Sequence, residues 1–123
     1  ILIKTDSAGD TLWTRTYGGE SLDVGSCVQQ TTDGGYIITG INFSLVLPDH
    51  GDVWLVKTDT LGNEIWNHTY GGVGLDWGRS VQQTTDGGYV VVGWREIVIG
   101  GQSDSDVWLI LTDPEGNAEY LGQ

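Results

Sequence analysis

The sequence repeats itself after 53 positions, and this repeat limits the fold more than any other feature. Residues 1–40 and 54–93 align without a gap and are identical at 23 of 40 pairs. The best-matched stretches, Val28–Gly40 and Val81–Gly93, each place Asp-Gly-Gly before a β-branched run. Because glycine adopts the positive φ of tight turns and aspartate bonds back to the turn backbone, this pattern predicts a repeated β-hairpin.

Each period contains four strand-like runs separated by turn residues. In the first unit these are Cys27–Thr31, Tyr36–Ile41, Val53–Thr58 and Glu64–Tyr70. In the second unit they are Ser80–Thr84, Tyr89–Trp94, Val107–Thr112 and Ala118–Leu121. A leading pair, Ile1–Thr5 and Thr11–Tyr17, corresponds to the third and fourth strands of a unit. The expected elements are therefore all strands.

Four antiparallel strands in a repeat of this length predict an all-β fold made of β-propeller blades. The chain holds about two and a half blades: a leading strand pair in 1–18, a first full blade in 19–70 and a second in 71–123. All three belong to one propeller-type repeat domain. The connection from Gly93 to Asp106 is one residue longer than its counterpart in the first unit, so we expect a loop there.

Two and a half blades are too few for a ring, since propellers contain about four to eight. Three explanations stay open: a piece of a longer propeller, a ring built from several copies, or an open head-to-tail polymer. The chain also begins without methionine, inside an expected strand, as a processed product or a piece of a longer protein would. The expected partners are copies of the chain itself or further blades of a longer one.

Four tryptophans recur at equivalent repeat positions: Trp13, Trp54, Trp66 and Trp108. Burying one such side chain stabilises a fold by roughly 4–6 kcal/mol as an upper bound. Packing between blades is enough to explain this recurrence, so we interpret the four as core residues rather than as a binding site.

Charge and cysteine content exclude several classes of function. The formal charge is −12, from 17 acidic against 5 basic residues, and such a surface repels nucleic acid. No apolar run approaches membrane-spanning length. Cys27 is the only cysteine, and the repeat replaces it with Ser80, so we expect neither an intrachain disulfide nor a catalytic thiol.

Catalytic and metal-binding patterns are missing from the sequence. His50 and His68 are the only histidines, and neither recurs in the other repeat. No nucleophile, metal-protease or phosphate-loop motif occurs, so we expect neither an enzyme nor a cofactor. Two acidic segments, 49–52 and 103–106, carry oxygen ligands but match no full calcium loop, so we interpret them as solvated and predict no metal.

A carbohydrate site is the alternative function. Trp77 and Trp94 replace Val24 and Ile41 of the first unit, so repeat packing alone does not require them. With Asp76 beside Trp77, they are the candidate ligand-binding residues, since an aromatic face with polar neighbours suits a sugar. Filling of local space is the simpler interpretation, because a multivalent lectin should repeat its sites.

Two sequons make Asn42 and Asn67 candidate glycosylation sites. Asn42 begins an expected loop, which suits an acceptor, whereas Asn67 lies on an expected outer strand.

The stretch Trp54–Trp66, followed by Thr69–Gly72 and Ser80–Tyr89, resembles a repeat common in secreted and cell-surface proteins of archaea and bacteria. Those proteins look like β-propellers, and no catalytic motif is shared among them. The resemblance implies an extracellular or cell-surface location. We therefore expect a non-catalytic structural or interaction scaffold, self-assembling through blades or strands, with a carbohydrate-binding propeller as the alternative.

Overall fold

The computed structural model describes residues 1–43, 45–47 and 50–121, and the described part is built from strands. In chain order the strands are β1 (Leu2–Thr5), β2 (Thr11–Arg15), β3 (Asp23–Gln30), β4 (Tyr36–Phe43), β5 (Gly51–Thr58), β6 (Glu64–Tyr70), β7 (Asp76–Gln83), β8 (Tyr89–Ile99), β9 (Gln102–Thr112) and β10 (Ala118–Leu121). The all-β prediction is confirmed.

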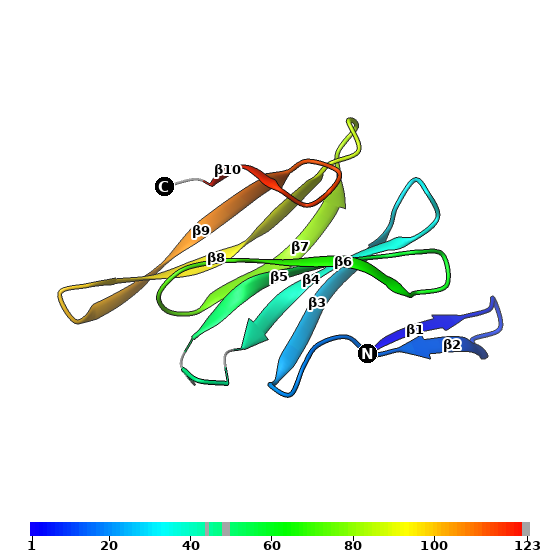
Figure 1. Ribbon diagram of the computed structural model, residues 1–123, viewed down its shortest axis with the longest axis horizontal. Coiled ribbons are helices and arrows are strands. Elements are labelled where there is room, and N and C mark those ends of the chain that lie inside the picture. The colour runs from blue at the N-terminus through cyan, green and yellow to red at the C-terminus, as the bar shows by residue number, and fades with distance from the viewer. Residues whose placement is uncertain (44, 48–49, 122–123) are drawn as a thin grey trace.

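The strands form three open antiparallel sheets, shown in Figure 1. One contains β1 and β2, the next runs β3-β4-β5-β6, and the last runs β7-β8-β9-β10. Each strand pairs with its neighbour in sequence, as hairpin connections require. We call each four-stranded sheet a unit.

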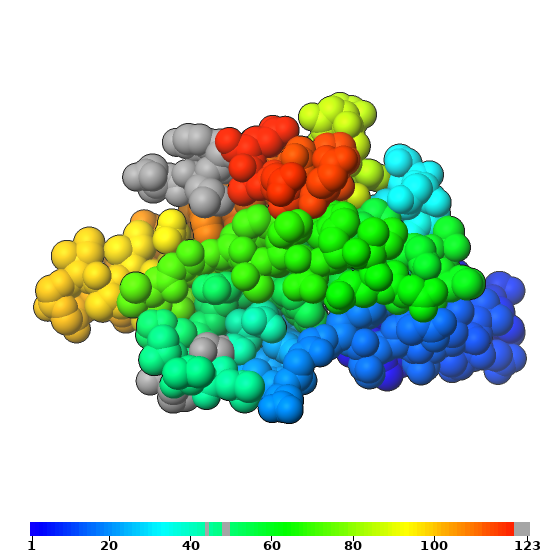
Figure 2. Space-filling view, viewed as in Figure 1, coloured from blue at the N-terminus to red at the C-terminus, as the bar shows by residue number. Residues whose placement is uncertain are grey.

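The prediction of a loop between Gly93 and Asp106 is wrong. Strand pairing continues from Arg95 and Asp106 to Ile99 and Gln102, so β8 and β9 form a long hairpin that projects beyond the other strands (Figure 2). The physical reason is the Gly100–Gly101 pair, whose φ values of 60° and 79° fit a two-residue hairpin turn. The β-branched residues before this turn favour the extended strand.

The first strand of each unit begins four residues earlier than predicted, at Asp23 and Asp76. A β-bulge interrupts the pairing just after Gly25 and Gly78. The pairing resumes beyond the bulge, at Cys27 and Ser80. A strand prediction that requires side chains to alternate without a break between the two faces misses such an extension. The extra residue of a bulge shifts this alternation by one position.

The Asp-Gly-Gly turn is confirmed in atomic detail. In the β3–β4 hairpin, Asp33 Oδ1 accepts hydrogen bonds from Gly35 N, at 2.9 Å, and from the Thr31 hydroxyl. Gly34 has a φ of 87°, which a residue with a Cβ rarely adopts. The β7–β8 hairpin repeats this geometry with Thr84, Asp86 and Gly88.

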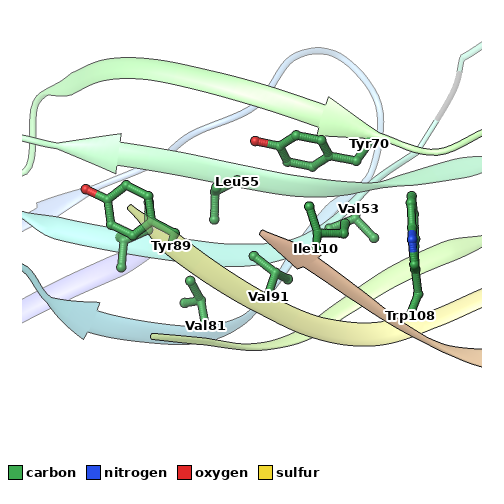
Figure 3. Close-up of a cluster of buried hydrophobic side chains, with 9 residues drawn as sticks. Val53, Leu55, Tyr70, Val81, Tyr89, Val91, Trp108 and Ile110 are labelled. Atoms are coloured by element: carbon green, nitrogen blue, oxygen red, sulfur yellow. The ribbon is translucent and has the colours of Figure 1, made fainter. Parts of the chain in front are cut away.

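The main core lies between the two units. Figure 3 shows side chains of one unit facing those of the other. The first unit contributes Ile37, Val53, Leu55 and Tyr70, and the second contributes Val81, Tyr89, Val91, Trp108 and Ile110. β7 packs across β3, β4 and β5. The two sheets are therefore joined face to face by apolar packing.

The contact between sheets occurs twice, one period apart. Trp66 meets Tyr89 edge to face, with ring centroids 5.9 Å apart and planes at 64°. Trp13 of β2 meets Tyr36 of the first unit at the same 5.9 Å and at 70°. The β1–β2 hairpin therefore sits on the first unit as β5 and β6 sit on the second.

A second pair of contacts follows the same period. The Tyr70 hydroxyl donates to the carbonyl of Gly116, and the Tyr17 hydroxyl donates to the carbonyl of Gly62, at 2.6 Å. Burial raises the pKa of Tyr70, which keeps this hydroxyl protonated and able to donate. Each sheet thus bonds to the turn between the last two strands of the sheet that follows it.

Candidate functional site

Trp77 lies on β7 and links the two units. Its Nε1 donates to Ser26 Oγ of β3, at 2.8 Å. The Arg79 guanidinium covers one face of its ring, 4.3 Å from the centroid. The indole edge and one ring face are therefore already engaged by the protein.

The structure brings the other two candidate ligand-binding residues close to Trp77. Trp94 pairs with it across β7 and β8, with ring centroids 6.3 Å apart, and both rings are half-buried. Asp76 is fully buried, at 0% exposure, and its Oδ2 accepts from Gly72 N at 3.0 Å. The two tryptophans reach solvent together, whereas the carboxylate faces inward to hold the loop between β6 and β7.

Asp76 also lies near Asp52 of β5. Burial raises the pKa of both carboxyls, and the charge of Asp76 further raises the pKa of Asp52. A Cβ on Gly71 would lie 2.2 Å from Asp52 Oδ1 and 2.7 Å from Asp76 Oδ2, so the two carboxylates converge beneath this glycine. No cluster of three or more His, Cys, Asp or Glu suited to a metal ion occurs among the described residues.

The acidic segments considered for calcium differ in their surroundings. Asp49 lies outside the described residues, and Asp52 belongs to β5. Asp104 and Asp106 are exposed on β9 rather than gathered in a loop. The structure does not bring the two segments together into one site.

The two histidines and the cysteine lie beside other groups of the protein. His68 Nε2 donates to the Glu115 carbonyl at 2.9 Å, and its ring lies 5.1 Å from that of Trp66, in the contact between the units. Cys27 is half-buried, with its Sγ 4.0 Å from Ser80 Oγ. His50 is half-buried near Asp52.

The two sequon asparagines are placed differently. Asn42 is half-buried on β4 and donates through Nδ2 to Asp23 Oδ1 at 2.7 Å, while Ser44 of its sequon lies outside the described residues. Asn67 is exposed on β6, and its side chain contacts Trp54 Nε1 and Glu64 Oε2.

Sequence reasoning missed an uncovered apolar surface on the second unit. We call it the outer face: Val90, Val92, Val107, Leu109 and Leu111, on the side of β8 and β9 away from the first unit. Val107 is 82% exposed and Leu109 51%, whereas their repeat equivalents Val53 and Leu55 are 1% and 0% exposed. Aligning the third strands of the two units shows that Val107 and Leu109 are equivalent to Val53 and Leu55, but their exposure depends on how the sheets meet and gives no signal in the sequence.

A second apolar surface, only partly covered, lies on the first unit. We call it the open face: Val28, Ile38 and Trp54, around a hollow of about 230 Å³ beside the β1–β2 hairpin. Val28 is 44% exposed, whereas its equivalent Val81 is 2% exposed beneath the first unit. The hairpin covers only part of this side, through contacts of Leu2 and Tyr17 with Ile38, Trp54 and Val56.

Comparison with protein-family models and with curated proteins finds no match for this chain. Within residues 1–43, 45–47 and 50–121, no helix has the length and apolarity needed to cross a membrane.

Proposed function

We propose that this chain is a non-catalytic β-propeller repeat module that serves as an extracellular or cell-surface scaffold. One observation carries the proposal: the sheet-to-sheet contacts recur one period apart, with Trp13 on Tyr36 and then Trp66 on Tyr89. Successive sheets that meet in one constant way are the building principle of a propeller.

The arrangement of strands supports a radial placement of the two units around a common axis. The first strands of the two units lie near each other, since Trp77 of β7 bonds to Ser26 of β3. The turn after β3 also meets the end of β7, where Thr32 N donates to Gln83 Oε1 at 2.9 Å. In a propeller the first strands line the central axis, so this proximity is the expected one. A ring needs further blades, from a longer chain or from other copies.

A scaffold role agrees with how the polar side chains are used. The hydroxyls of Tyr17 and Tyr70 and the ring of His68 bond to backbone groups of a neighbouring sheet. Catalysis needs a nucleophile, a base and a stabilising donor that converge on open space. These three side chains are instead engaged in holding sheets together.

Carbohydrate binding is the second candidate, favoured by the two half-buried indole rings of Trp77 and Trp94 at one end of the second unit. A sugar ring stacks on such a surface through its apolar face. The Ser26 bond and the Arg79 contact of Trp77 support the scaffold instead, because they already occupy that side chain.

A glycan array separates the two functions. Wild-type protein, Trp77→Ala and Trp94→Ala are applied in parallel, and circular dichroism establishes that each variant is folded. The scaffold proposal expects no specific glycan signal from any of the three proteins. A specific signal in the wild type that either folded variant loses would contradict it and establish the lectin function.

The proposed location rests on the resemblance to secreted repeats and is tested separately. Labelling of intact cells with an amine-reactive reagent that does not cross membranes should modify the protein at Lys4, which is exposed. Protection of the protein in intact cells, but not in lysed ones, would refute an extracellular location.

A further inference from the structure

The internal repeat shows what covers a face like the outer face. The first unit carries equivalent positions, Ile37, Thr39, Val53, Leu55 and Lys57, and all five are buried. The second unit covers them with the side that holds Val81, Val91 and Ile110. The natural cover for Leu109 and its neighbours is therefore the same side of another four-stranded unit.

The chain presents such a side on its first unit. Val28, Ile38 and Trp54 of the open face are the repeat equivalents of Val81, Val91 and Trp108. In the second unit these positions face the first unit, and Val81, Val91 and Trp108 are buried. One chain thus carries both halves of its own sheet-to-sheet interface: an exposed outer face and an open face on which Val28 is exposed while Ile38 and Trp54 are covered by Leu2 and Tyr17.

We infer that the outer face of one copy docks on the open face of a second copy, in the arrangement that joins the two units within a chain. This inference rests on the proposed scaffold function and names its partner. Because the two surfaces differ, the contact is heterologous, and repeating it gives a ring or an open filament.

Polar groups match across the same contact. Within the chain, Thr32 N donates to Gln83 Oε1 at 2.9 Å. One period away, the corresponding groups are Thr85 N of the first copy and Gln30 Oε1 of the second. The Gln30 side chain is already oriented, since its Nε2 donates to Gly34 O at 3.2 Å. Its Oε1 is thus positioned to accept the incoming N–H.

Docking of a complete unit requires the β1–β2 hairpin of the receiving copy to leave. Leu2 of β1 is the repeat equivalent of both Leu55 and Leu109, so the incoming β9 would occupy the place of β1. The hairpin supplies two strands where a complete unit supplies four. Its replacement also covers Val28, which the hairpin leaves 44% exposed. The exchange therefore buries apolar surface that no part of the single chain covers.

Sedimentation and light scattering over a concentration series test the docking with matched variants. Leu109→Lys alters the outer face and Val28→Lys alters the open face. Ile65→Lys, on β6 and 58% exposed, is the control for adding a charge at an exposed apolar residue. Wild type and the control should assemble as concentration rises. Each face variant should weaken association at least about tenfold, because docking would bury an unpaired ammonium group.

Mixing the two face variants tests the head-to-tail geometry. Leu109→Lys keeps an intact open face and Val28→Lys keeps an intact outer face, so an equimolar mixture should form heterodimers that grow no further. A mixture that remains monomeric would contradict the geometry. So would a mixture that forms long assemblies.

Displacement of the hairpin is tested with Trp13→Ala, which removes the ring that contacts Tyr36. A hairpin that must leave competes with docking, so this variant should assemble more strongly than wild type. Unchanged or weaker assembly would overturn the proposed exchange. A wild type that stays monomeric at every concentration would overturn the docking itself, while the glycan array tests the scaffold function independently of either result.

Discussion

Lys57 is the cation that the sheet-to-sheet core encloses. It is 5% exposed, and its Nζ lies 3.0 and 3.2 Å from the two carboxylate oxygens of Asp33. It also donates to the Thr58 carbonyl at 2.7 Å. The second unit has Leu111 at this position, although Asp86 keeps the same turn bonds. The repeat therefore offers two turns that differ by one ion pair.

Asp33→Asn should lower the free energy of unfolding by about 1–2 kcal/mol, because it leaves the enclosed ammonium without its counter-ion. We place this below the usual range for a broken buried pair, since Asp33 itself is 60% exposed and screened by solvent. The Thr31 hydroxyl, the Gly35 N–H and Lys57 together lower the pKa of Asp33 to about 2. The stabilisation should therefore be complete above pH 4 and disappear as pH falls from about 4 to about 2.

Urea unfolding of wild type and variant across this pH range measures the effect. Asp86→Asn is the matched control, because it removes equivalent bonds to Thr84 and Gly88 where no lysine is present. Equal losses in the two variants, or a loss at Asp33 that does not change with pH, would show that the ion pair is not the cause.

At the level of strands, the sequence predicts those whose ends are marked by turn residues. The limits of β6 and β10 agree with prediction, because an Asp-x-x-Gly-Asn turn precedes each of them. The extension of β8 and β9 was missed because the one-residue insertion between Gly93 and Asp106 suggested a loop. Pairing depends instead on the Gly100–Gly101 turn. Its geometry places the polar start of β9 beside the apolar end of β8.

The turn between β9 and β10 is a contact point as well as a connection. Gly116 has a φ of 82°, and a Cβ there would lie 2.5 Å from His68 Cδ2 and 2.7 Å from the Trp66 ring. Its carbonyl accepts the Tyr70 hydroxyl. The absence of a side chain therefore lets two sheets approach.

Gly116→Ala should destabilise the protein by roughly 2–4 kcal/mol, combining the strain of a positive φ with displacement of packed rings. Gly87→Ala is the control, because Gly87 has a similar φ of 89° and its nearest foreign atom, Pro114 Cγ, is at an ordinary 3.6 Å. The control should cost about 1–2 kcal/mol. Similar losses in the two variants, measured by thermal unfolding, would exclude the steric role of Gly116.

For the molecule as a whole, charge opposes the association that its faces favour. Each copy carries a formal charge of −12 on 13.3 kDa. Salt screens repulsion between exposed charges, and apolar docking does not depend on them. Head-to-tail association should therefore strengthen as sodium chloride is raised from low concentration to about 0.5 M, where the screening length is only a few ångströms.

Light scattering at fixed protein concentration measures the salt response. The Val28→Lys variant should remain monomeric throughout, which excludes general salt-induced aggregation. Association that weakens with salt would indicate an interface held by opposite charges instead of by the apolar faces.

The uncovered faces also show where sequence reasoning stops. Leu55 and Leu109 occupy equivalent positions, and alternation predicts that both point out of a sheet. Only the structure shows that the first is enclosed and the second is not. Likewise, the unusual Trp77 could be noticed in the sequence, but its bond to Ser26 depends on how the sheets meet.

The Tyr–Gly and Trp–Tyr contacts have a consequence for how such a chain could arise. A single unit contains the residues for both sides of its junction with the next, so tandem duplication of its gene segment supplies every new junction at once. No compensating change is needed for the array to lengthen. Sequence drift is then free only away from the junctions, as in the divergent ends of β8 and β9.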